Sequence, residues 1–181
     1  MLTYITANND KIFFAKKGLL PQGITFETKA LELIEIQSSS IEEITHHKAK
    51  QAFAILGTPV FVTDEGWSIP ALNGFPGAYM KYMNEWLSPH DYLHLMESHS
   101  NKTIIKSVAL CYADSKNTRC FTATYEGEFI NSIQGNGFSA MRVVSMTSDG
   151  KSVAECIEQG INPFNDSSFW KEFGMWYKNL A

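Results

Sequence analysis

Two acidic stretches carry the side chains most suited to chemistry. In Gly57–Trp67, written GTPVFVTDEGW, an apolar run ends in Asp64 and Glu65, and Glu35 stands in LELIEIQ. We predict a buried strand with the carboxylates at its tip, where ligands of open α/β sheets bind. Such carboxylates can hold magnesium against a polyphosphate or accept a proton from an attacking water. In the alternative interpretation, Asp64 and Glu35 are ordinary surface acids at strand ends, which is the more common role of a single such residue. Glu65 is either a metal ligand or a turn residue.

The N-terminal segment TANNDK offers donors for a phosphate group. Thr6 and Asn8 precede a predicted helix, so that backbone N–H groups, the helix dipole and Lys11 can converge on an anion. In the alternative interpretation, Asn8 or Asn9 caps the helix and Lys11 is solvated. Lys48, on a later helix, could reach back to the same phosphates or face solvent.

The other possible metal ligands are interpreted as structural or surface residues. His90 and His94 are four apart, but the HExxH glutamate and a third ligand are missing. Cys111, Cys120 and Cys156 lack the short paired spacings of zinc sites and redox couples. We expect reduced structural thiols.

Apolar strands alternate with helix-like segments along the chain. We expect strands at about 2–7, 31–36 and 59–62, with helices at about 11–17 and 40–56, the latter opened by a capping box of Ser40 and Glu43. Further helices are expected near 79–82 and from about 89 and 168, with a hairpin made of 103–112 and 118–125. Interleaved strands and helices plus one hairpin predict an α/β domain with a mixed sheet.

Composition narrows the class of protein. A chain of 181 residues that is 44% hydrophobic is the size of one domain, and we expect a single domain over 1–181. A net charge of -4 without a basic cluster argues against nucleic-acid polymers as partners. No apolar run is long enough to span a bilayer, and the N-terminus does not read as a signal peptide, so we expect a cytoplasmic protein without membrane contact.

Several ordered blocks together resemble the inosine triphosphate pyrophosphatase family over about three quarters of the sequence. TANNDK is similar to the family's (S/T)-x-N-x-x-K phosphate motif, ELIEIQ to its acidic strand, and SIEEITHHKAKQA to the helix that follows. PVFVTDEGWSIPALNGFPGAYMKY resembles its most characteristic block. By this resemblance the phosphate-binding residues are Thr6, Asn8, Lys11, Lys48 and Lys81, the metal ligands are Glu35 and Asp64, and Asp64 is also the catalytic residue. From its position beside Asp64, Glu65 is a further candidate metal ligand.

The resemblance implies a fold and an activity. The fold is an elongated mixed β-sheet with flanking helices, in two lobes around a central cleft, and the protein is a homodimer. The activity is Mg²⁺-dependent hydrolysis of purine nucleoside triphosphates such as ITP, dITP and XTP to monophosphate and pyrophosphate, which cleans the nucleotide pool. Lys11, Lys48 and the metal would hold the triphosphate while a water activated near Asp64 attacks the α-phosphorus. Lys81 either adds a phosphate contact or is solvated.

The chain also departs from the family pattern. Thr63 stands where the family commonly has an aspartate, and Glu65 replaces a small hydroxyl residue. The segment Phe138–Arg142, FSAMR, replaces FG(Y/W)DP, and the C-terminal Ser-His-Arg motif is absent. Phe138 could stack on a base or belong to the core. The alternatives to the family activity are a pyrophosphatase with altered base specificity and a non-catalytic nucleotide-binding protein of the same fold.

Overall fold

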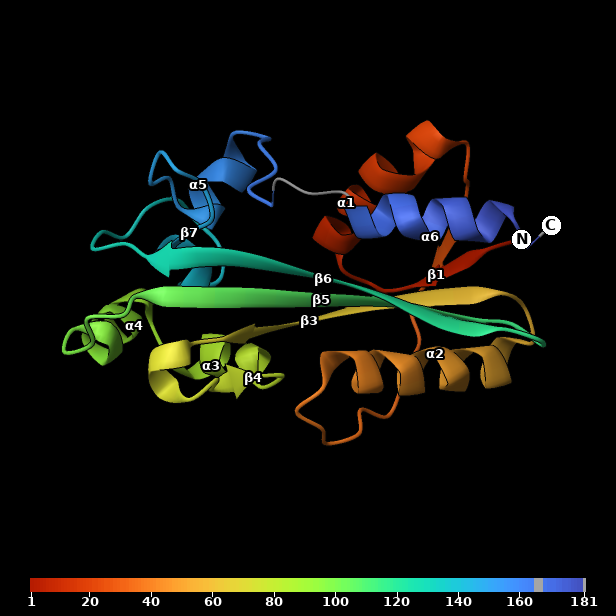
Figure 1. Ribbon diagram of the computed structural model, residues 1–181, viewed down its shortest axis with the longest axis horizontal. Helices are drawn as coiled ribbons and strands as arrows, with labels where there is room; N and C mark the ends of the chain where they lie inside the picture. Colours follow the sequence, from red (N-terminus) through yellow and green to blue (C-terminus); the bar gives the residue numbers. More distant parts are fainter. Residues whose placement is uncertain (165–167, 181) are drawn as a thin grey trace. The chain divides into compact units, whose positions relative to one another are not determined.

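The computed structural model describes residues 1–164 and 168–180, and its strands form a mixed sheet (Figure 1). In the described residues the sheet has seven strands in the order β2-β1-β3-β5-β6-β7, with β4 paired to β3. β1 is parallel to β2 and to β3. β4 is antiparallel to β3, and β7 is antiparallel to β6. The strands are β1 (Thr3–Ile5), β2 (Glu27–Lys29), β3 (Val60–Ser68), β4 (Pro76–Gly77), β5 (Thr103–Ala113), β6 (Thr118–Phe129) and β7 (Val144–Ser145). The predicted mixed α/β sheet is confirmed.

The helices flank this sheet, and local signals set several of their ends. The α-helices are α1 (Asn9–Leu19), α2 (Ile41–Leu56), α3 (Met80–Trp86), α4 (Pro89–Met96), α5 (Val153–Glu158) and α6 (Ser168–Lys178), and the short 3-10 helices are η1 (Leu20–Gln22), η2 (Pro70–Leu72) and η3 (Ser139–Arg142). The Ser40 side chain caps α2 by accepting from the Glu43 N–H, as predicted, and Gly57 ends the helix at φ 65. The Glu43 carboxylate accepts from Ser38 instead of closing the box. Each helix described here is too short or too polar to cross a bilayer.

The chain divides into two compact units. The first comprises Met1–Glu65, Val108–Ala123 and α6, and the second comprises Gly66–Ser107 and the described residues from Thr124 on to Phe164. Strands β3, β5 and β6 each contribute residues to both units. All the predicted site residues up to Glu65 belong to the first unit, so their arrangement can be described within it.

The first unit packs helices on both faces of its strands. Phe61 of β3 faces a core that it shares with Ala15 of α1 and Phe173 of α6, and Figure 1 shows these two helices on one side of the strands. Val60 and Val62 point to the opposite face, where α2 packs. Because neighbouring residues of a strand point to opposite faces, β3 sends alternate side chains toward α1 and α2.

The second unit has its own core. Trp67 and Ile69, at the end of β3 and just beyond it, pack with Met83 of α3 and Tyr92 of α4. The Ser88 and Asp91 side chains form a complete capping box at the start of α4, which confirms the helix predicted from about residue 89.

The predicted hairpin is confirmed, but it changes the interpretation of the cysteines. β5 and β6 are neighbours, and the Asp114 N–H donates to the Asn117 carbonyl across the turn. Cys111 and Cys120 face each other on these strands and form a disulfide, with Cα atoms 4.1 Å apart. The expectation of reduced thiols was therefore wrong for these two, because antiparallel pairing brings distant residues opposite each other. Cys156 is free and buried.

Candidate active site

Strand β3 places Asp64 inside the sheet and not at its tip. The strand continues through Asp64 and Glu65 to Ser68, so the predicted strand end before these carboxylates was wrong. Its pairing with β1, however, extends only to the Tyr4–Phe61 pair. Asp64 therefore lies in a stretch of strand that β1 no longer covers, and its side chain, 20% exposed, can meet side chains from both neighbouring helices.

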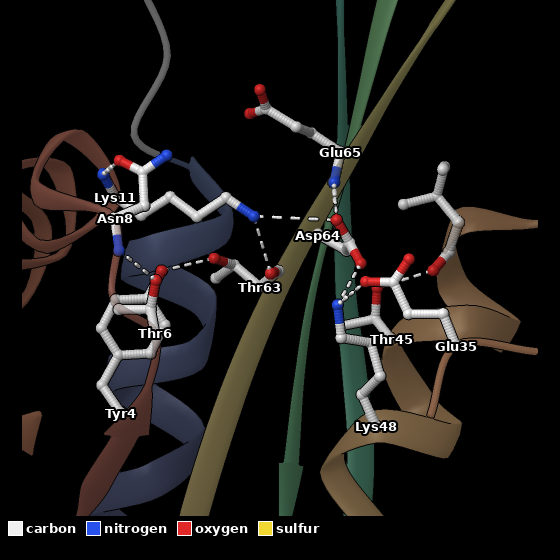
Figure 2. Close-up of polar contacts among 11 residues, drawn as sticks. Tyr4, Thr6, Asn8, Lys11, Glu35, Thr45, Lys48, Thr63, Asp64 and Glu65 are labelled. Carbon is white, nitrogen blue, oxygen red and sulfur yellow. Dashed lines mark hydrogen bonds and ion pairs between the residues drawn. The ribbon is translucent and has the colours of Figure 1, made fainter. Parts of the chain in front are cut away.

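Lys48 of α2 holds two carboxylates at once. Its Nζ donates to Asp64 Oδ2 at 2.8 Å and to Glu35 Oε1 at 2.7 Å (Figure 2). Thr45 and Ala52, one helical turn before and after Lys48, are fully buried, so this stripe of the helix faces the sheet. The Lys48 side chain is accordingly only 14% exposed, and the solvent-facing interpretation is wrong.

Lys11 approaches Asp64 from α1. Its Nζ donates to the Thr63 carbonyl at 3.1 Å and lies 3.7 Å from Asp64 Oδ1. The side chain is 25% exposed and is directed at β3, so it is not the solvated lysine of the alternative interpretation. Lys11, Lys48, Glu35 and Asp64 thus gather in one cluster (Figure 2), which we call the ion-pair cluster.

Thr6 and Asn8 shape the turn that precedes α1. Asn8 Oδ1 accepts from the Asp10 and Lys11 N–H groups, so the cap interpretation of Asn8 is confirmed. Thr6 Oγ1 accepts from the Asn8 N–H at 3.1 Å. With these oxygens acting as acceptors, the Thr6 hydroxyl hydrogen and the Asn8 amide hydrogens are the donors that the two side chains can direct at a phosphate.

Glu35 reaches the cluster from an irregular segment. The strand predicted at 31–36 was wrong, because residues 30–38 have no strand pairing and the edge strand is β2. The Gln51 side chain of α2 accepts from the Ile34 N–H at 2.8 Å and donates to the Ile34 carbonyl, as a neighbouring strand would. The Glu35 side chain is 63% exposed, which leaves it open to solvent on the side away from Lys48.

The charges of the cluster stabilise one another. Burial by itself raises the pKa of the Asp64 carboxyl, but the charges of Lys11 and Lys48, with hydrogen bonds from Lys48 and the Glu65 N–H, hold that pKa below its usual value. Burial lowers the pKa of the Lys48 ammonium, but the Asp64 charge and the hydrogen bonds to Asp64 and Glu35 raise it above its usual value. At neutral pH Asp64 is therefore a carboxylate and Lys48 an ammonium.

Glu65 is a strand residue, so the turn interpretation was wrong. Its N–H donates to Asp64 Oδ1 at 2.9 Å, whereas Figure 2 shows its carboxylate pointing away from Asp64 and Lys48. Within residues 1–164 and 168–180, no three His, Cys, Asp or Glu side chains form a ready metal cage. The role of Glu65 as a metal ligand stays a prediction.

Tyr4 is a residue that the sequence analysis missed. It is fully buried on β1, and its hydroxyl is hydrogen-bonded to the Thr63 hydroxyl. Thr63 stands where the inosine triphosphate pyrophosphatase family commonly has an aspartate. It is hydrogen-bonded through its side chain to Tyr4 and through its carbonyl to Lys11. Nothing in the sequence marks Tyr4, because a tyrosine in an apolar strand is an ordinary core residue.

The remaining predicted site residues, Lys81 and Phe138, belong to the second unit. Lys81 of α3 is exposed, with its Nζ 5.8 Å from the centre of the Tyr82 ring. Phe138 immediately precedes η3 and is 56% exposed, so the interpretation of Phe138 as a core residue is wrong. Their roles toward a nucleotide stay predictions.

Comparison with solved structures identifies the fold. The Staphylococcus aureus Ham1 protein is 19% identical in sequence, with a TM-score of 0.77 over 100% of both chains. The HAM1 protein from Coxiella burnetii is 18% identical, with a TM-score of 0.78 over 99% of this chain and 100% of that one. The chain therefore has the mixed α/β fold of these proteins.

Sequence comparison identifies the family. Residues 2–159 match the model of the Ham1 family. A dITP/XTP pyrophosphatase from Methanopyrus kandleri is 31% identical over 180 residues, which cover 97% of this chain and 95% of that protein. An inosine triphosphate pyrophosphatase from Candida glabrata is 30% identical over 138 residues, 72% of each chain. The chain belongs to the Ham1 family, and the resemblance identified from its motifs is confirmed.

Proposed function

We propose that the protein is a nucleoside triphosphate pyrophosphatase that hydrolyses non-standard purine nucleotides such as ITP, dITP and XTP to the monophosphate and pyrophosphate. Removal of these nucleotides from the precursor pool is its cellular role. The observation that carries the proposal is the ion-pair cluster, in which Lys11 and Lys48 meet Asp64 and Glu35. The names of the relatives supply the substrate class.

The two lysines are suited to holding a triphosphate. Both are ammonium groups on flexible stems, and they belong to a cluster that Glu35, 63% exposed, leaves open to solvent. Phosphate oxygens are stronger partners for an ammonium than a carbonyl such as that of Thr63. We expect Lys11 to exchange its bond to the Thr63 carbonyl for a bond to the phosphate chain, with Thr6 and Asn8 as neighbouring donors.

Asp64 is suited to the proton transfer. It is ionised at neutral pH and is largely shielded from solvent, so it can accept a proton from a water positioned for in-line attack. The water oxygen forms a bond to the α-phosphorus, the bond from that phosphorus to the bridging oxygen breaks, and pyrophosphate leaves with the electron pair. The Asp64 carboxyl then returns its proton to solvent.

The donor set of the cluster fits Mg²⁺. Magnesium in nucleotide enzymes is usually bound by one or two carboxylates together with substrate phosphates, not by a closed protein cage. Glu35 and Asp64 supply two hard oxygen donors that already share a single cation, the Lys48 ammonium. We propose that they hold Mg²⁺, which when bound neutralises phosphate charge and lowers the pKa of water.

The proposal also covers recognition of the base, the oligomeric state of the protein and its location in the cell. The exposed ring of Phe138 is the candidate for stacking on the base, and Lys81 for a further phosphate contact. Because FSAMR keeps the first aromatic residue of the family's FG(Y/W)DP segment but lacks its aspartate, we expect the preferred base to differ from that of the family. We also propose a cytoplasmic homodimer that acts on free nucleotides and not on nucleic-acid polymers.

The test is release of pyrophosphate from a panel of standard and modified triphosphates in the presence of Mg²⁺. We expect turnover with inosine or xanthosine nucleotides that is lost when Mg²⁺ is chelated. Asp64→Asn removes the proton acceptor and should lower turnover by at least about 100-fold. Glu35→Gln should raise the Mg²⁺ concentration required, because it removes one of the two carboxylates.

The matched control is Glu32→Gln, which neutralises an exposed acid in the same irregular segment and should leave turnover unchanged. Normal turnover by Asp64→Asn would remove Asp64 from the mechanism. Binding of nucleotides without turnover of any of them would favour the non-catalytic alternative.

A further inference from the structure

The ion-pair cluster balances its own charge. It contains two ammonium groups, on Lys11 and Lys48, and two carboxylates, on Glu35 and Asp64. Clusters that attract free divalent cations carry an excess of negative charge, as calcium loops do. The charge of this cluster is already neutralised by residues of the chain itself.

The bonds of Asp64 also occupy the positions that a metal would need. Oδ2 accepts from Lys48 at 2.8 Å, and Oδ1 accepts from the Glu65 N–H at 2.9 Å with Lys11 Nζ 3.7 Å away. A magnesium–oxygen bond is about 2.1 Å long, so an ion bound to Oδ2 would lie within about 5 Å of the Lys48 Nζ. Like charges at that distance in a partly buried site repel strongly.

Lys48 is more important than Lys11 for this exclusion. Lys48 contacts both carboxylates and is the less exposed of the two lysines, whereas Lys11 bonds to the neutral Thr63 carbonyl and is farther from Asp64. Removal of Lys48 would leave two carboxylates facing each other without the cation between them (Figure 2). Two uncompensated carboxylates at this spacing would attract a divalent cation to the free protein.

We infer that Lys48 is a resident counter-ion that keeps divalent metal out of the free protein, so that the metal binds only together with a polyphosphate. The identity of the polyphosphate as a nucleoside triphosphate rests on the proposed function. When its phosphates arrive, Lys48 and Lys11 transfer to them, and Glu35 and Asp64 become available to the cation that the phosphates carry. Metal and nucleotide then strengthen each other's binding by the same factor, as thermodynamic linkage requires.

The test measures metal binding without turnover. Mn²⁺ is titrated into the free protein, and the unbound ion is followed by electron paramagnetic resonance. We expect wild-type protein to bind Mn²⁺ weakly and Lys48→Met to bind it at least about 10-fold more tightly, because a positive charge beside the carboxylates is gone. Lys50→Met removes the same charge from an exposed position of α2 and should match the wild type.

A second measurement tests the linkage in the wild-type protein. Binding of α,β-methylene inosine triphosphate, which resists hydrolysis at the bond in question, is measured by calorimetry with Mg²⁺ and with a chelator. We expect Mg²⁺ to strengthen nucleotide binding in the wild type, and the strengthening factor to be about 10-fold smaller in Lys48→Met, in proportion to its gain in affinity for metal alone.

Equal Mn²⁺ affinities of the wild type and Lys48→Met would overturn the inference, as would tight binding of Mn²⁺ to the free wild-type protein. Thermal unfolding of each variant establishes that it is folded, and Lys48→Gln is the substitute if Lys48→Met is not. The proposed function is tested separately. If Lys48→Met binds Mn²⁺ more tightly but the wild-type protein hydrolyses no nucleotide, this inference stands and the proposed activity is wrong.

Discussion

The hydroxyl pair of Tyr4 and Thr63 gives the sharpest test of how the site is held. Beyond Phe61, β1 no longer pairs with β3, so the segment that leads to Asp64 is held on that side by side chains. The Thr63 hydroxyl bonds to the Tyr4 hydroxyl, and both residues are buried. Burial raises the pKa of the Tyr4 phenol well above its ordinary value, so it remains a neutral hydrogen-bonding group at every physiological pH.

The expected magnitudes follow from leaving one buried hydroxyl without its partner. Tyr4→Phe keeps the ring, which stacks on Phe61 at 4.3 Å, and removes only the oxygen. Thr63→Val keeps the shape of the side chain and removes its hydroxyl. Each single change should lower the free energy of unfolding by about 1–3 kcal/mol, because an unsatisfied buried hydroxyl remains. In the double variant neither hydroxyl remains, so no buried hydroxyl lacks a partner. The free energy of unfolding of the double variant should therefore fall by no more than that of either single variant.

The assay is urea unfolding of the four proteins followed by circular dichroism. We expect a coupling free energy of about 1–3 kcal/mol between the two positions, at least as large as the loss in either single variant and in the range measured for residues that share a hydrogen bond. If the losses of the two single variants sum to the loss of the double variant within about 0.5 kcal/mol, the two hydroxyls act independently and this account of the segment is refuted.

Three further predictions concern other parts of the chain. Because the folded-state pKa of Asp64 is depressed, its ion pairs stabilise the protein above the unfolded pKa of about 3.9 and stop doing so as the pH falls through the lower folded value. Asp64→Asn should therefore be less stable than the wild type at pH 7, and urea unfolding should show this difference closing below about pH 4. Phe138→Ala should leave the unfolding midpoint nearly unchanged, because the ring is exposed, but should raise the KM for the preferred nucleotide by about 5-fold or more if the ring stacks on the base. Alkylation of the denatured, unreduced protein should modify Cys156 alone, since Cys111 and Cys120 are joined, and mass spectrometry of the product counts the labels.

The sequence predicted the parts of the site that local patterns control. The Ser40 cap fixes where α2 begins, and the register of the helix then places Lys48 on the face that carries Thr45 and Ala52. Family motifs placed Lys11 and Asp64 in one site, and the structure brings them to 3.7 Å. These features depend on caps, on helical spacing and on the apolar run of β3, all of which can be read from neighbouring residues.

The errors arose where contacts between distant segments decide the structure. LELIEIQ alternates like a strand, yet the edge position beside β1 is taken by Glu27–Lys29, whose residues are all exposed and show no apolar alternation. The Gln51 amide then satisfies the backbone of Ile34 in place of a strand. Likewise the acidic residues of β3 do not end the strand, because lysines from two helices compensate the Asp64 charge. No local pattern reports such partners.

The ion-pair cluster and Phe138 come from different segments of the chain. The four charged side chains of the cluster all come from the uninterrupted stretch between Lys11 and Asp64, whereas Phe138 belongs to a unit assembled from two other segments. Mutations in the unit that contains Phe138 would therefore fall in different parts of the gene from mutations of these lysines and acids. Under the proposed function, such a layout would let base preference change by mutation of one part of the chain while the charged residues in another part stay the same.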